Sequence, residues 1–388
     1  MSASPTRLAH VTTVPMTLGF LRGHIDYLRG HAYQVAVVSS PGDDLNAFGS
    51  QHQVRTHGVA MERQMSPFND AVSLYRLWRL FRRLNPDIVH SHSPKAGLLG
   101  TVAARAAGVP VVYLSIFGLA QMTKTGPTRR LLDATTRLAC RLADRVWCDS
   151  ESMRSYVAAQ GLCDPEKLMV VGNGSVGGID AAVQFAPDVH RAASAQIRET
   201  FGIPEDSPVL GYVGRLTRDK GTGELARAWG QLREKYEDLH LLLVGPFEAG
   251  DPLDPADEQI LRSDPRVHLA GMQHAVAPFL GAMTVFAMPS YREGFGMTNL
   301  EAAAMGLPVV ATDIPGCTDS VADGATGTLV PVADVPALTS AIDRYLGDEA
   351  LRRAHGNAGR RRALEEFQPE RMWTELAASY AASLASRR

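Results

Sequence analysis

The chain has 388 residues, of which 45% are hydrophobic and 21% charged, and its formal net charge is -2. This length corresponds to two or three domains with cores of their own, and the hydrophobic content excludes a disordered chain. Because phosphate binding needs a clear basic excess, near-neutrality argues against nucleic acid as the main partner.

The cysteines and the N-terminal residues indicate a cytoplasmic protein. None of the four cysteines forms a CxxC pair or has a metal-ligand spacing with histidine, so we expect reduced thiols. Residues 1–11 contain no apolar signal segment, and no uncharged apolar stretch of about 18 residues occurs anywhere in the sequence. We therefore expect neither a signal peptide nor a membrane-spanning helix.

Short β-branched runs alternate with longer amphipathic patterns along the whole chain. The runs predict strands at residues 8–12, 34–39, 88–90, 111–114, 146–148, 168–171, 209–213, 241–244, 267–270, 285–288, 309–312 and 328–330. The amphipathic patterns predict helices such as 71–84, 128–143, 222–235 and 300–305. This alternation is typical of parallel sheets covered by helices on both faces, so the fold class is α/β with two doubly wound, Rossmann-like domains.

The domain boundary is predicted near residue 185, where a Gly-rich segment gives way to a polar helix and a Pro-flanked turn. Residues 1–185 contain 19 Lys+Arg and 13 Asp+Glu, a net charge of +6. The remainder contains 20 and 28, a net charge of -8. The near-zero total therefore conceals a basic half and an acidic half.

Residues 172–177, GNGSVG, match a dinucleotide-binding GxGxxG pattern directly after a predicted strand. A dinucleotide site also needs a helix that opens at once and an acidic residue after the next strand. Here Gly178, Asp180 and then Pro187 follow, so we interpret this segment as an irregular loop.

The loop at residues 211–221, GYVGRLTRDKG, leaves the first strand of the second half and enters a helix. Doubly wound domains bind ligands at the carboxyl ends of their strands, where this loop places Arg215 and Lys220 near a helix N-terminus. Two cations in this position suit a diphosphate. The alternative is a solvated loop in which Arg218, Asp219 and Lys220 form a surface ion pair.

Residues 293–301, EGFGMTNLE, carry two carboxylates eight residues apart around a Gly-rich turn that opens a helix. Gly294 and Gly296 allow close approach of the backbone to a ligand, and free N–H groups near Met297 and Thr298 can receive an anion. The alternatives are that Glu301 complements a helix dipole and that Glu293 is an ordinary loop carboxylate.

EGFGMTNLE resembles the E-x7-E motif of glycosyltransferase family 4, whose members are retaining enzymes with the GT-B fold. GRLTRDKG resembles that family's diphosphate loop, and AAAMGLPVVATDIPG and DGATGTLV resemble its downstream segments. The similarity runs through nearly the whole chain. VTTVPMTLGFLRGH, DIVHSHSPKAGLLG and VVGNGSVGGID are most similar to bacterial capsule, O-antigen and exopolysaccharide transferases, which extend polyprenyl-diphosphate-linked sugars.

The resemblance implies a role for each matching residue. Glu301 is expected to bind the ribose of a donor nucleotide and Glu293 the hydroxyls of the transferred sugar, while Arg215 and Lys220 neutralise the diphosphate. No cofactor and no divalent metal are expected where these two cations serve. The other donor-binding candidates are Gly214, Gly294, Phe295, Gly296, Met297, Thr298 and, in the first half, Gly19.

The sequence departs from the family at two places. Many members carry a Gly-Gly pair after the first strand, where this chain has residues 15–19, PMTLG, with Gly19 alone. Many also carry a donor-binding histidine at the place of Phe117, so that hydrogen bond is missing unless His90 or His92 replaces it or the donor is unusual. The candidates on the acceptor side are Thr17, His24, His92, Lys95 and Phe117.

We interpret His90 and His92 as a strand-end pair with structural hydrogen bonds. A metal site needs at least a third ligand, and the sequence shows none near this pair.

Two basic helical patterns in the first half are candidates for membrane contact. Residues 74–84, LYRLWRLFRRL, and residues 129–145 combine arginines with apolar side chains. Such faces suit an anionic membrane surface. The alternative is that the apolar stripe, including Trp78, is core and the arginines are solvated.

The resemblance implies an acceptor-binding domain at 1–185 and a donor-binding domain at 186–368, facing each other across a cleft, with a helix at 369–388 that packs back on the first. The expected reaction is retaining transfer of an N-acetylhexosamine or hexose from a UDP-sugar to a glycolipid acceptor, at the cytoplasmic membrane face. The alternatives are a soluble transferase for a small natural product, a GT-B UDP-sugar epimerase, and a binding module without catalysis, suggested only by Phe117. Nothing in the sequence specifies the oligomeric state.

Overall fold

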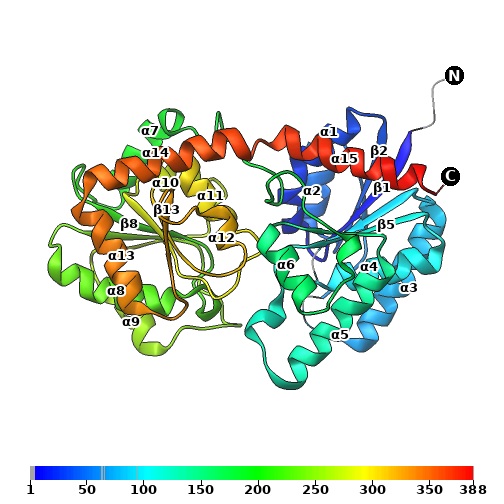
Figure 1. The fold of residues 1–388 in the computed structure, drawn as a ribbon, viewed down its shortest axis with the longest axis horizontal. Helices are drawn as coiled ribbons and strands as arrows, with labels where there is room; N and C mark the ends of the chain where they lie inside the picture. The colour runs from blue at the N-terminus through cyan, green and yellow to red at the C-terminus, as the bar shows by residue number, and fades with distance from the viewer. Residues whose placement is uncertain (1–4, 63, 65, 93, 388) are drawn as a thin grey trace. The chain divides into compact units, whose positions relative to one another are not determined.

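A computed structural model describes residues 5–387, apart from residues 63, 65 and 93 (Figure 1). The chain forms two compact units, one up to Gly178 together with the segment from Pro369, the other Ile179–Gln368. The boundary lies a few residues before the expected position of 185. The reason is that the Ile179 amide donates to the carbonyl of Phe367 (2.8 Å) and Arg360 donates to the carbonyl of Phe185 (3.2 Å), which joins residues 179–185 to the second unit.

The described part of the N-terminal unit contains a seven-stranded, wholly parallel sheet in the order β3-β2-β1-β4-β5-β6-β7. The order reverses between β1 and β4. The strands are β1 Thr6–Val11, β2 Tyr33–Ser39, β3 Arg55–Gly58, β4 Ile88–Ser91, β5 Val111–Ile116, β6 Arg145–Cys148 and β7 Leu168–Met169. The helices are α1 Arg22–Arg29, α2 Asp43–Gln51, α3 Pro67–Leu84, α4 Pro94–Ala107, α5 Gly126–Leu142, α6 Glu151–Ala159 and α15 Pro369–Ala385, with 3-10 helices at Pro15–Phe20, Ala120–Thr123 and Pro165–Lys167.

The C-terminal helix α15 belongs to this N-terminal unit. It packs against α1, where a Cβ at Gly23 would lie 2.3 Å from the ring of Trp373, so only glycine permits this approach. Tyr380 of α15 is fully buried beside Tyr113 of β5, their ring centroids 4.8 Å apart. The last helix therefore completes one face of the N-terminal core.

The C-terminal unit contains a six-stranded parallel sheet in the order β10-β9-β8-β11-β12-β13, which reverses between β8 and β11. The strands are β8 Val209–Val213, β9 His240–Val244, β10 Val267–Gly271, β11 Val285–Met288, β12 Val309–Thr312 and β13 Gly327–Val330. The helices are α7 Pro187–Thr200, α8 Thr222–Lys235, α9 Pro255–Ser263, α10 Ala277–Gly281, α11 Met297–Ala304, α12 Cys317–Ser320, α13 Val335–Gly347 and α14 Glu349–Glu366, with a 3-10 helix at Arg218–Lys220.

The GxGxxG segment is an irregular loop, as the sequence indicated. Residues 172–178 are turns and bends, and the next helix, α7, begins only at Pro187. A Cβ at Gly177 would lie 2.8 Å from the carbonyl oxygen of Phe20, so this glycine serves close packing inside the unit. No helix in the described part of the chain has the length and apolar character that crossing a membrane requires.

Candidate active site

The loop after β8 is shaped by a glycine and closes against the loop after β11. The 3-10 helix Arg218–Lys220 follows β8, and α8 then begins at Thr222. Between them Gly221 has φ +68°, and a Cβ there would lie 1.9 Å from the carbonyl oxygen of Pro289. Because only glycine permits this approach, Lys220 lies next to the residues that follow β11.

Close backbone packing also fixes the loop after β11. Gly296 has φ +76° at the N-terminus of α11, and a Cβ there would lie 2.8 Å from Nδ2 of Asn299. A Cβ at Gly316, with φ +89°, would lie 2.5 Å from the carbonyl oxygen of Gly294. The Gly-rich turn is therefore held at the start of α11, whose first N–H groups have no partner within the helix.

An ion pair joins the two predicted motifs. Nζ of Lys220 lies 2.6 Å from Oε1 of Glu293, and the two side chains are 20% and 13% exposed. Both residues follow neighbouring strands at the point where the strand order reverses. In an open α/β sheet, ligands bind outside the carboxyl ends of the strands at such a point.

Arg215 belongs to a second group of charges in the same loop. Its guanidinium lies 2.7 Å from Glu248 and 3.5 Å from Asp219. Asp219 also accepts hydrogen bonds from the Thr217 hydroxyl (2.6 Å) and from the guanidinium of Arg292 (2.7 Å). Asp219 therefore forms ion pairs with two arginines from two different loops.

The charges in this group are maintained despite partial burial. Burial by itself raises the pKa of Asp219, but the Thr217 hydrogen bond and the positive charges of Arg292, Arg215 and Lys220 outweigh it, so the pKa is lowered overall. Burial by itself lowers the pKa of Arg215, but the carboxylates of Glu248 and Asp219 raise it overall. The loop after β8 therefore presents fixed cations.

Sequence reasoning missed Arg292 and Glu248 and named Asp219 only as a member of a surface ion pair. Asp219 lies inside the motif and Arg292 lies directly before Glu293, so the density of charge in these segments was an available signal. Glu248 follows β9 and has no local signal, because only the sheet brings β9 beside β8.

The other donor-binding candidates lie in the same segment but are not equivalent. Glu301 is half-buried on α11, one turn into the helix. Thr298 donates its hydroxyl hydrogen to Sδ of Met288 (3.0 Å), and Met297 packs partly against the core. Phe295 is 1% exposed and meets Phe367 edge to face. Its side chain is therefore core, a correction that leaves only its backbone for a ligand.

The first-unit candidates are placed as follows. Thr17 is half-buried in the 3-10 helix Pro15–Phe20, and Gly19 of that helix is exposed with open space where a Cβ would lie. Nζ of Lys95 lies 2.7 Å from Oδ1 of Asp70, so its charge is paired with α3. Phe117 is half-buried, stacks on the ring of His92 and meets Trp147 edge to face.

His24 and His92 need a correction as acceptor-side candidates. His24 is 3% exposed and His92 is not exposed at all, because both rings lie in the core of the N-terminal unit. His90 is also fully buried, so neither His90 nor His92 presents its ring to a donor in place of the missing family histidine.

Comparisons with known proteins identify the class that this fold and these loops define. The family model described as "Glycosyl transferases group 1" matches residues 207–348, and that described as "Glycosyl transferase 4-like domain" matches residues 21–174. Among solved structures, a sucrose-phosphate synthase from Thermosynechococcus elongatus covers 98% of this chain and 100% of its own, with a TM-score of 0.82 and 21% identity. HepE of Anabaena, solved in complex with UDP-glucose, covers 97% and 99%, with a TM-score of 0.79 and 19% identity. The molecule is a glycosyltransferase with the GT-B fold of two Rossmann-like domains.

Sequence relatives narrow the class to a family. The capsular polysaccharide biosynthesis glycosyltransferase CapM of Staphylococcus aureus is 32% identical over 377 residues, 96% of each chain. A UDP-Gal:alpha-D-GlcNAc-diphosphoundecaprenol alpha-1,3-galactosyltransferase of Escherichia coli is 27% identical over 355 residues, 90% of each chain. This chain belongs to the group 1 glycosyltransferase family, with a 4-like N-terminal domain, as the resemblance implied.

Proposed function

We propose that this protein transfers an N-acetylhexosamine or a hexose from a UDP-sugar to an acceptor hydroxyl, with retention of the anomeric configuration. The observation that carries the proposal is the 2.6 Å contact between Lys220 and Glu293. It unites a cationic loop and a carboxylate loop at the carboxyl ends of β8 and β11, the arrangement that a donor with an anionic diphosphate and a neutral sugar requires.

The two charges would change partners when the donor binds. The diphosphate pairs with the ammonium of Lys220 and the guanidinium of Arg215. The carboxylate of Glu293 is then free to accept hydrogen bonds from the sugar hydroxyls. Glu301 binds the ribose, and the backbone N–H groups at residues 294–296 contact the sugar. As the glycosidic bond breaks, negative charge grows on the departing UDP, so fixed cations stabilise the transition state more than the ground state. In this proposal no divalent metal takes part in the transfer.

The acceptor we propose is a polyprenyl-diphosphate-linked glycan in the synthesis of a cell-surface polysaccharide. The names of the two sequence relatives support this choice, since one acts in capsule synthesis and the other on a sugar diphosphoundecaprenol. The unit formed by residues 1–178 and 369–388 contains 22 Lys+Arg and 14 Asp+Glu, a net charge of +8. A positive field of this kind attracts an anionic acceptor.

We further propose that α3 and α5 bring the protein to the cytoplasmic face of an anionic membrane. Phe68 and Tyr75 of α3 are 80% and 57% exposed, and Leu131 and Leu138 of α5 are 48% and 46% exposed. The arginines at 76, 79, 82 and 83 are exposed on α3, and among the described residues no ion pair includes them. Trp78 packs partly against the core, so the contact surface consists of the exposed residues alone.

A panel of nucleotide sugars tests the donor. A ligand present at 100 times its dissociation constant stabilises the folded protein by about 2.7 kcal/mol, so thermal shifts with UDP-GlcNAc, UDP-GalNAc, UDP-glucose, UDP-galactose and GDP-mannose should single out one or two UDP-sugars. Incubation of that donor with polyprenyl-diphosphate-linked GlcNAc should then yield a lipid-linked disaccharide, whose α linkage is read by NMR.

The same incubations separate the rival functions. Isomerised donor without acceptor would indicate an epimerase. Transfer to a small water-soluble acceptor in preference to the lipid would indicate the natural-product transferase. A donor that binds yet releases no UDP under any condition would indicate a binding module. A shift with GDP-mannose and none with any UDP-sugar would contradict the proposed donor.

A further inference from the structure

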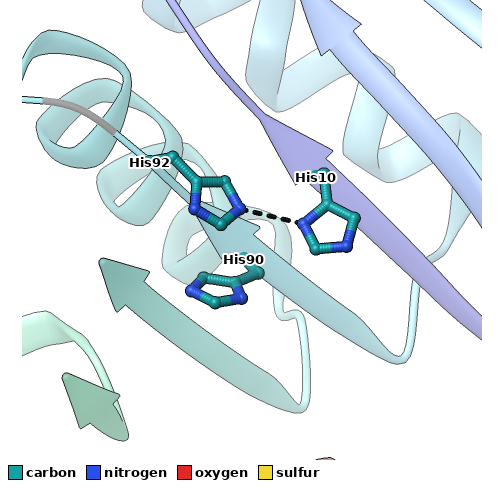
Figure 2. A group of neighbouring side chains, drawn as sticks. All are labelled: His10, His90 and His92. Carbon is teal, nitrogen blue, oxygen red and sulfur yellow. Dashed lines mark hydrogen bonds between the residues drawn. The ribbon is translucent and has the colours of Figure 1, made fainter. Parts of the chain in front are cut away.

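The topology of the N-terminal sheet gathers histidines that the sequence leaves far apart. His10 of β1 pairs in register with His90 of β4, and paired residues of parallel strands point to the same face. His92 lies two residues beyond His90 and so faces the same way. Figure 2 shows the three imidazole rings together. The structure therefore brings in the third imidazole that the sequence did not show.

The rings are close enough to share one ligand. Nδ1 of His10 lies 2.9 Å from Nε2 of His92, and ring centroids are 4.1 Å apart for His90 and His92 (Figure 2). One ring nitrogen from each of the three histidines lies within 4.8 Å of the other two. All three side chains have no solvent exposure.

Hydrogen bonding leaves part of this group unsatisfied. His90 is engaged at both nitrogens, by the hydroxyls of Tyr380 (2.6 Å) and Ser115 (2.7 Å). Nε2 of His10, Nδ1 of His92 and both nitrogens of the neighbouring His24 are buried without a hydrogen-bond partner. The nitrogens that lack partners on His10 and His92 are not the two that lie 2.9 Å apart, so they are not the atoms that would face a shared ligand.

An imidazole binds a metal through the lone pair of its neutral form.

We propose that His10, His90 and His92 bind one transition-metal ion of the zinc class. Three imidazoles with no carboxylate in the group suit Zn²⁺ and exclude Ca²⁺ and Mg²⁺, which take oxygen ligands. Ligand atoms of a tetrahedral zinc site lie roughly 3.3 Å apart. The pair now at 2.9 Å must therefore separate slightly, and the nitrogen of His90, which lies within 4.8 Å of the others, must move towards them.

The surroundings of His90 supply an outer shell for such an ion. Nε2 of His90 would bind the metal in place of the Ser115 hydroxyl, and Nδ1 would keep its hydrogen bond to the hydroxyl of Tyr380. A ligand histidine that donates its other N–H to an oxygen is oriented by that bond. Because Tyr380 lies on α15, the ion would connect the C-terminal helix to β1 and β4. The ion would stabilise the packing of these three elements, and with three protein ligands its fourth position would be left to a non-protein ligand such as water.

Zinc binding to the untagged full-length chain tests this inference. The protein is stripped with a chelator, equilibrated with Zn²⁺ and desalted, and bound zinc is measured by elemental mass spectrometry. The wild type should hold one equivalent, and Co²⁺ in its place should give the visible absorption bands of a tetrahedral site. His92→Asn should lose the equivalent, and Tyr380→Phe should weaken binding about tenfold to a hundredfold.

A second histidine pair provides the matched control. His240 and His268 in the C-terminal unit stack with Nδ1 and Nε2 also 2.9 Å apart, but they belong to no group of three such ligands among the described residues. His240→Asn should keep the full equivalent of zinc. The inference would be overturned if the wild type bound no zinc. It would also be overturned if His240→Asn lost as much zinc as His92→Asn, or if a folded His92→Asn kept the full equivalent of zinc. If His92→Asn does not fold, the Co²⁺ spectrum of the wild type and the Tyr380→Phe titration decide.

Discussion

Nζ of Lys220 and Oε1 of Glu293 lie 2.6 Å apart although 73 positions separate them in the sequence. The contact exists because β8 and β11 are neighbours in the sheet and because Gly221 lets the two loops meet at Pro289. It joins the GRLTRDKG loop to the first carboxylate of the EGFGMTNLE segment.

Replacement of Lys220 should slow transfer without unfolding the protein. A charge-assisted hydrogen bond contributes about 1.5 to 3 kcal/mol, so Lys220→Met should lower kcat/KM roughly ten- to hundredfold. Lys235→Met is the matched control, because Lys235 of α8 pairs with Asp343 away from the site. Equal losses in the two variants, measured as UDP release, would contradict a specific role for Lys220.

The two carboxylates of the E-x7-E segment should differ in their effects. Glu301→Gln should mainly raise the dissociation constant of the donor, because its proposed partner is the ribose. Glu293→Gln should mainly lower kcat, because its proposed partner is the transferred sugar. Donor titrations and steady-state kinetics measure both quantities, and full activity in both variants would show that the site is assigned to the wrong residues.

Gly221→Ala should destabilise the C-terminal unit and reduce activity together. The φ of +68° disfavours a side chain, and the Cβ would lie 1.9 Å from a backbone oxygen, so the loops must separate. Gly230→Ala on α8 is the control, because a Cβ there meets nothing and alanine favours a helix by about 0.5 to 1 kcal/mol. Thermal unfolding should show a lower Tm for Gly221→Ala and an unchanged or higher Tm for Gly230→Ala.

The N-terminal unit, stripped of metal, should lose stability as the pH falls below about 6.5. The pKa of His10 is lowered by burial to about 3, so between these values the unfolded chain binds the proton and the folded chain does not. For one such group the free energy of unfolding falls by about 1.4 kcal/mol per pH unit in this window. Three of the four tryptophans, Trp78, Trp147 and Trp373, lie in this unit, so urea unfolding followed by tryptophan fluorescence reports on it. A midpoint that stays constant from pH 7 to pH 5 would refute the expectation.

Reversal of charge on α3 should weaken binding to anionic vesicles. Arg76, Arg79, Arg82 and Arg83 are exposed, and each basic residue near such a surface contributes about 1 kcal/mol. A variant with all four changed to Glu should fail to float with phosphatidylglycerol vesicles at low salt. The control changes Arg353 of α14, 77% exposed in the other unit, and should float as the wild type does. Failure of the wild type itself to float would remove the membrane proposal and leave the transferase proposal intact.

Local patterns were enough to predict the two doubly wound units, the two motif loops and every described strand except β3, Arg55–Gly58. Its four residues, RTHG, are exposed or half-buried and contain no apolar run that would predict a strand. A strand or a Gly-rich turn depends on residues that are close in the sequence, and so its signal is local. The start of α11 was misplaced by three residues, since the apolar pattern begins at Leu300 but Gly296 ends the turn and the helix begins at Met297. The boundary was misplaced because Ile179 and Phe185 are bound to residues near 360, a contact without a local signal.

The sequence by itself determined the family, the fold class and the positions of Arg215, Lys220, Glu293 and Glu301, because each belongs to a short motif. Only the tertiary structure decided that Lys220 meets Glu293, that Asp219 holds two arginines, and that Phe295, His24 and His92 are buried. It also joined His10 to His90 and His92. The helix at 369–388, which the resemblance already placed on the first domain, lies in the first unit, whose net charge is +8 against -10 for residues 179–368. The physical reason is that these relationships depend on which strands pair, in what register, and on which helices pack over them, and that arrangement is set by the burial of a whole sheet and not by any local stretch of chain.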